Sequence, residues 1–158
     1  KGRTPAIASA QPQTKRLTMT APAGLSVSKK ISEAKLLTEL QEQFDRNNEI
    51  GFQARYQALQ QRFSKSKRLN EAHYMAGLMH LGSKNYGRSL KAFDSVLKNK
   101  PTESQAAGAT FAKAMTFKRM NLMDQVAPLL RQVQVKYPKT FEAQRAAMEL
   151  KILEKRFQ

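Results

Sequence analysis

Apolar and polar residues follow one another along most of the chain with the spacing of an α-helix. From Ile31 onward the apolar residues recur at steps of three and four, which places them on one helical face. Two such stripes lie in residues 70–101, separated by a short polar break at 83–85. The pattern predicts helices at about 32–46, 49–64, 70–82, 86–99, 103–119, 122–136 and 140–157.

The helical pattern also repeats, with a period of 37 residues. Leu37, Tyr74 and Phe111 make one such series, and most of the other series also keep their apolar character. A fixed period in this range predicts helical hairpins that stack and bury a face on each neighbour. We therefore expect an all-α domain over residues 31–158, with about three hairpins and a last helix that caps the stack.

Several polar residues stand where a predicted helix begins and are suited to capping it. We expect four asparagines to cap helices, three of them at equivalent hairpin turns: Asn48, Asn85, Asn121 and, for the helix at 70–82, Asn70. Thr102 and Gln105 have the spacing of a capping box for the helix at 103–119. Ala76 and Gly77 are small enough to let two antiparallel helices approach closely.

The stretch 70–101 resembles a tetratricopeptide repeat, because Gly77, Phe93 and Pro101 stand at the spacing of that motif. His73 and Ser89 depart from it, at positions where the motif often has tryptophan and alanine. The resemblance covers residues 32–157 and implies a right-handed superhelical stack whose first helices line a concave, peptide-binding groove. The junction at 137–150 is similar to that of periplasmic Tol–Pal-associated members, which implies a bacterial cell-envelope compartment, with cytoplasm or an organelle as the alternative.

The resemblance also locates the residues of the groove. Its two apolar rows and basic end are expected to include nine residues: Leu37, Tyr74, Leu78, Phe111, Met115, Lys118, Arg119, Met148 and Ile152. An apolar trough with a cationic rim suits a peptide that carries acidic flanks. The alternative is that longer helices or the N-terminal arm cover this trough.

The net charge of +16 points to an anionic partner as a second function. Residues 1–30 hold six Lys or Arg, no acid and no aromatic residue, so we expect an extended or disordered arm: a linker, a partner-binding segment or part of a transit peptide. Four further cations share one face of the helix at 86–99 and its preceding turn: Lys84, Arg88, Lys91 and Lys98. With the arm, they would suit a structural component of a ribonucleoprotein or another anionic assembly.

Residues with the spacing of known catalytic or metal motifs are missing from the sequence. The chain has no cysteine, and His73 and His80 are two helical turns apart, roughly 10 Å, which is too far to share one zinc ion. We expect both histidines to pack against the adjacent helix. No apolar run approaches the roughly 18 residues that span a bilayer. The sequence thus predicts a non-enzymatic adaptor without cofactor, which binds a protein or peptide partner.

Overall fold

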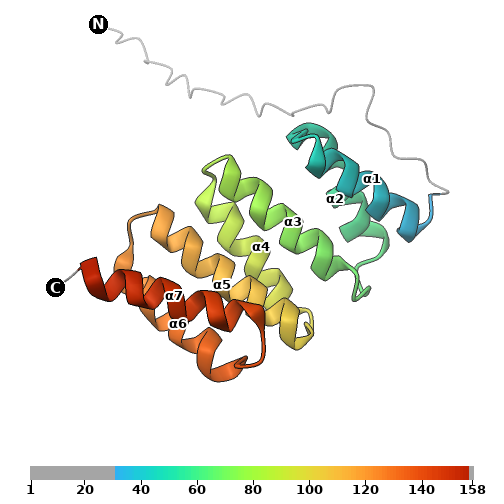
Figure 1. Ribbon diagram of the computed structural model, residues 1–158. Coiled ribbons are helices and arrows are strands. Elements are labelled where there is room, and N and C mark those ends of the chain that lie inside the picture. The colour runs from blue at the N-terminus through green and yellow to red at the C-terminus, as the bar shows by residue number, and fades with distance from the viewer. Residues whose placement is uncertain (1–30, 157–158) are drawn as a thin grey trace, which may run out of the picture.

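The computed structural model describes residues 31–156, and within this range the chain forms seven α-helices and no strand (Figure 1). They are α1 (Glu33–Asp45), α2 (Glu49–Arg62), α3 (Leu69–Gly82), α4 (Tyr86–Lys98), α5 (Glu103–Arg119), α6 (Met123–Lys136) and α7 (Phe141–Arg156). All seven predicted helices are confirmed, with ends that differ from the prediction by at most two residues. The predicted arm, residues 1–30, lies outside the described residues.

Successive helices pair as hairpins, α1 with α2, α3 with α4 and α5 with α6, and α7 packs on α6. Figure 1 shows them following one another along the molecule from blue α1 to red α7. The odd-numbered helices also contact one another in order, so α1, α3, α5 and α7 share one side of the molecule, here called the odd-helix surface. Among the described helices, none is both long and apolar enough to cross a membrane.

Each hairpin turns on one residue in the left-handed backbone region. Asn47, Lys84 and Asn121 have φ of 52°, 59° and 61°, and they are spaced by the period of the repeat. After each of them, the next backbone N–H bonds a carbonyl five residues back, as Asn48 does to Gln43 at 2.9 Å, which closes the helix end in a Schellman motif. Asn121 is therefore a helix-ending residue, and its predicted capping role is wrong.

The remaining capping predictions divide between right and wrong. Asn48 caps α2 as predicted, since its side chain accepts a hydrogen bond from the Gly51 N–H at 3.1 Å. Thr102 and Gln105 form the predicted capping box of α5, with bonds of 3.3 and 3.1 Å. Asn85 stands at the N-cap position of α4 as predicted, but its side chain makes no capping bond, so that part of the prediction is wrong.

Asn70 is not a cap either, because α3 begins one residue earlier and buries it inside the junction. Its Nδ2 donates to the carbonyl oxygen of Asn99, at the end of α4, and to Oε1 of Gln105 in α5, both at 3.2 Å. The side chain thus links three helices instead of finishing one.

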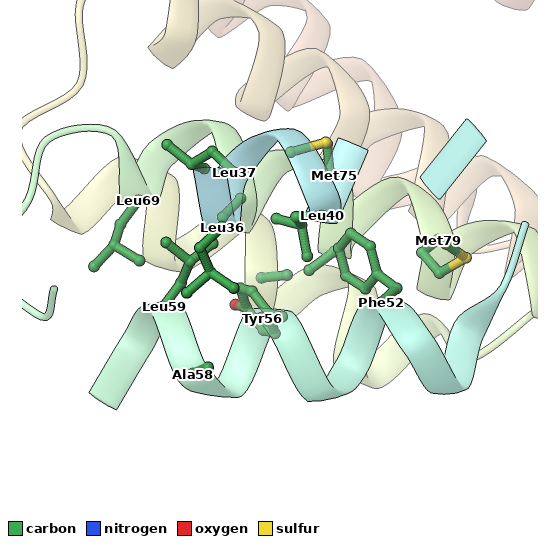
Figure 2. Packing of buried hydrophobic residues seen from close by; sticks show 13 residues of the cluster. Leu36, Leu37, Leu40, Phe52, Tyr56, Ala58, Leu59, Leu69, Met75 and Met79 are labelled. Atoms are coloured by element: carbon green, nitrogen blue, oxygen red, sulfur yellow. The ribbon is translucent and has the colours of Figure 1, made fainter. Parts of the chain in front are cut away.

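The core of the described residues consists of three clusters that follow one another along the stack, built from the apolar side chains of neighbouring helices. Figure 2 shows the first cluster, where Leu36 and Leu40 of α1 face Phe52 and Leu59 of α2, and α3 adds its methionines. In the second hairpin, the absence of a side chain at Gly77 makes room for the Phe93 ring, which is fully buried.

The junction between α2 and α3 differs from the two later junctions. It spans residues 63–68, whereas 99–102 and 137–140 suffice after α4 and α6. Ser66 stands at its centre, where its hydroxyl donates to the Glu33 carboxylate and its carbonyl accepts from Asn99 Nδ2 at 3.3 Å. The apposition of α2 and α3 is correspondingly sparse compared with α4 on α5 or α6 on α7.

Candidate functional site

The apolar residues of the predicted groove lie on the odd-helix surface at different depths. Leu37 and Phe111 are buried, while Tyr74, Leu78 and Met115 are half-buried. Tyr74 is held from two sides, with its ring centroid 5.6 Å from that of Phe93 and its ring carbons beside Gly108. These five side chains are therefore only partly accessible to solvent or not at all, and the apolar rows predicted from the sequence are less exposed than a groove lining would be.

The open part of the predicted groove lies on α7. Met148 and Ile152 are 57% and 55% exposed, and Phe141 extends the same apolar stripe. Arg145 lies between them, with its guanidinium 4.3 Å from the centroid of the Phe111 ring. This cation–π contact covers the Phe111 ring, so in this structure Arg145 lies between the ring and solvent.

The cationic rim predicted at Lys118 and Arg119 is largely satisfied within the chain. Lys118 Nζ lies 2.6 Å from Glu149 Oε2 of α7, which balances its charge. The Arg119 side chain reaches back to donate to the carbonyl of Leu81 at 3.4 Å. Position 149 is 31 residues away along the chain, so the sequence pattern did not reveal this ion pair.

A cleft of about 550 Å³ runs between α1 and α3. The first hairpin contacts α3 sparsely, and mainly through the buried side chains of the first core cluster, which leaves this space between α1 and α3. Residues from both helices and the junction line it: Leu37, Thr38, Gln41, Glu42, Arg68, Glu71, Tyr74 and Met75. Of these, Leu37 and Tyr74 were predicted to be groove residues.

A second, smaller cavity of about 240 Å³ lies between α3 and α5, beside the first. It is lined by Asn70, Glu71, Tyr74, Val96, Ser104, Gln105, Gly108 and, from α7, Glu142. Glu71 and Tyr74 line both spaces, so the two lie side by side, and together they are here called the connected site. Sequence reasoning missed Gly108, although it is the only glycine in the repeat series 34, 71, 108 and 145, and a glycine inside a helix signals a close approach or a gap.

The walls of this connected site are acidic, in contrast with the net charge of the chain. Three carboxylates line it, those of Glu42, Glu71 and Glu142, against the single cation Arg68. None of the three forms an ion pair with a described residue. The pKa of Tyr74 is raised, first by burial and next by the charge of Glu142, which the opposing effect of Arg145 reduces. The local charge is thus opposite to the one that would attract an acidic peptide flank.

The cations predicted to bind anions are all exposed. Lys84, Arg88, Lys91 and Lys98 lie on α4 and its preceding turn, and none pairs with a carboxylate of a described residue. They form a separate charged face that shares no residue with the connected site.

Both histidines are buried against neighbouring helices. His73 Nδ1 lies 2.7 Å from the Tyr56 hydroxyl, and burial lowers the pKa of His73 while it raises that of Tyr56 to about 12. His80 lies 3.8 Å from a Glu49 carboxylate oxygen, yet burial outweighs that charge and lowers its pKa. Within residues 31–156, no group of three or more His, Asp or Glu side chains is arranged to hold a metal ion.

Comparison of the chain with models of known families, with curated proteins and with solved structures finds no match. The resemblance to tetratricopeptide repeats therefore depends on Gly77, Phe93, Pro101 and the 37-residue period alone.

Proposed function

We propose that this protein is a non-enzymatic scaffold that binds a peptide segment of a partner protein along its odd-helix surface. The observation that carries the proposal is the connected site, in which clefts of about 550 and 240 Å³ meet at Tyr74 and Glu71. Ligand sites in proteins are concave and combine apolar walls with a few polar groups, and this site has that composition.

The size and shape of the surface favour a peptide over a small molecule. The connected site crosses α1, α3, α5 and α7, and the exposed stripe of Met148 and Ile152 on α7 adds an apolar patch on the same predicted groove rows. Peptides bind helical surfaces of this kind by placing a few side chains in successive hollows. Apolar side chains exposed together mark interaction surfaces.

A selection of random peptides displayed against the full chain would test this proposal. Selected peptides should lose affinity about tenfold or more when Gln41→Trp fills the first cleft, because an indole would occupy the space of the ligand. The matched control is Gln57→Trp, another exposed glutamine, on α2 and outside the lining of both clefts, which should leave affinity unchanged. Equal effects of the two substitutions, with folding intact, would refute binding in the cleft.

A second candidate function is supported by the four unpaired cations of the α4 face. An anionic partner held there would dissociate steeply with rising salt, because phosphate binding releases counterions. Charge reversal of Lys84, Arg88 and Lys91 should abolish such binding and leave the selected peptides unaffected. The reverse ranking, in which only the cleft variants lose their ligand, supports the scaffold.

A further inference from the structure

The cavity between α3 and α5 is lined by hydrogen-bond acceptors more than by donors. The carboxylates of Glu71 and Glu142 line it from α3 and α7. Oε1 of Gln105 already accepts from the Thr102 N–H and from Asn70 Nδ2, at 3.1 and 3.2 Å. A bound group with several N–H donors and a positive charge would complement this wall.

Asn70 provides an independent indication of a missing donor. Its amide nitrogen donates to two acceptors, the Asn99 carbonyl and Gln105 Oε1, so the orientation of the amide is settled. The amide oxygen is consequently left buried with no donor, in a residue that lines the cavity and is only 1% exposed. Buried acceptors are nearly always paired in folded proteins.

We propose that this cavity binds the lysine or arginine side chain of a basic peptide. The inference deepens the proposed function and rests on it. About 240 Å³ is below the range of a whole small-molecule site, which fits a pocket for one side chain. The cationic group would lie between Glu71 and Glu142, next to the ring of Tyr74, so that ion pairing and a cation–π contact act together.

The charges around the cavity support a cation and disfavour an anion. Among the residues that the structure describes, no basic one is part of its lining; Arg145 is held over Phe111, and its charge only partly offsets that of Glu142 at Tyr74. Gly108 lines the cavity, and a Cβ there would only reach ordinary contact with Tyr74 at 3.6 Å. A side chain can therefore begin at this position without a clash, and we expect a larger one to extend into the cavity.

The test uses the displayed peptides selected on the full chain. We expect the selected sequences to share a Lys or Arg, and replacing arginine by its neutral isostere citrulline should weaken binding about tenfold or more. In the double variant Glu71→Gln, Glu142→Gln the same replacement should change affinity less than about twofold, because the pairing charges are gone. Glu103→Gln, an exposed acid at the start of α5, is the matched control and should preserve the tenfold effect.

Gly108→Leu provides a second, uncharged test, because its side chain fills the cavity and should remove the preference for arginine. If the selected peptides bind in the cleft between α1 and α3 but keep their affinity when arginine is replaced by citrulline, the cation pocket is refuted and the scaffold proposal is not. Failure to select any peptide that competes at this cleft would refute the scaffold itself. The arm could also compete with the peptides for the pocket. If peptides bind the full chain weakly, and bind more tightly when the six basic residues of positions 1–30 are replaced by glutamine, the result supports the pocket and identifies the arm as its occupant.

Discussion

The close approach of α3 and α4 at Gly77 allows a test in which two identical substitutions have opposite effects. Gly77 and Gly108 both lie inside helices that begin a hairpin, and alanine is the change in each case. A Cβ on Gly77 would lie 2.4 to 2.7 Å from three ring carbons of Phe93, whereas a Cβ on Gly108 would lie 3.6 Å from Tyr74. Unstrained carbon contacts begin near 3.5 Å, so the first substitution requires a shift of about 1 Å and the second requires none.

The magnitudes follow from two opposing contributions. Alanine is favoured over glycine in a helix by about 1 kcal/mol, and both variants gain this amount. Overpacking against the fully buried Phe93 costs Gly77→Ala about 1–3 kcal/mol. We expect Gly108→Ala to raise the free energy of unfolding by about 1 kcal/mol, and Gly77→Ala to lower it by about 1 kcal/mol.

Urea unfolding followed by far-ultraviolet circular dichroism would measure both changes. The Phe93→Leu background is the control, because removing the ring edge should relieve most of the cost of Gly77→Ala. If Gly77→Ala stabilises the protein as much as Gly108→Ala, the packing of α3 on α4 described above is incorrect.

Four further predictions can be checked with the same unfolding assay. Burial lowers the pKa of His73 and His80 below 6.5, so as pH falls the unfolded chain binds protons before the folded one does. The contribution of these histidines to the free energy of unfolding should therefore be fully present above pH 6.5 and be lost as pH falls below it. Burial raises the pKa of Tyr56 to about 12, so the unfolding free energy should fall by up to about 2–3 kcal/mol between pH 10 and 12. The fall should be smaller in Tyr56→Phe, and the part that remains comes from other groups such as Tyr74, whose pKa is also raised. At neutral pH, Tyr56→Phe should itself cost about 1–2 kcal/mol, because His73 Nδ1 loses its partner at 2.7 Å while the ring packing persists. Lys84→Gly should raise the free energy of unfolding by about 0.5–1 kcal/mol, because glycine relieves the backbone strain at φ 59°. Asn121→Gly should raise it less, because asparagine tolerates this region, and equal gains would contradict the strain argument.

The helices could be predicted because the apolar stripe and the period of 37 are properties of neighbouring residues. Thr102 and Gln105 formed their capping box for the same reason, since both partners lie within one turn. Asn121 shows the limit of this reasoning. Asparagine suits both a helix start and the left-handed turn residue, and the backbone geometry of the turn decides between them. Asn85 does stand at the start of α4, but its side chain makes no capping bond.

The candidate site could be predicted less well because it depends on contacts between distant residues. Lys118 was predicted to lie at a cationic rim, and its pairing with Glu149 of another helix could not be seen in the sequence. Phe111 was predicted to be a groove residue, and the cover of its ring by Arg145 could not be seen either. The cavity at Gly108 arises from a missing side chain, and its acidic wall combines Glu71 and Glu142, which are 71 positions apart in the chain.

The sparse contact of α2 with α3 has a consequence for how the molecule opens. In an array of repeats, stability is the sum of each unit and its interfaces, so the weakest interface separates first. Amide hydrogens of α1 and α2 should accordingly exchange with solvent through a partial opening that leaves α3 to α7 protected. The cleft of about 550 Å³ lies between the first and second hairpins, so a ligand bound in it would contact both hairpins and slow that exchange. The end of the chain that unfolds most readily would then also be the end whose order reports that a partner is bound.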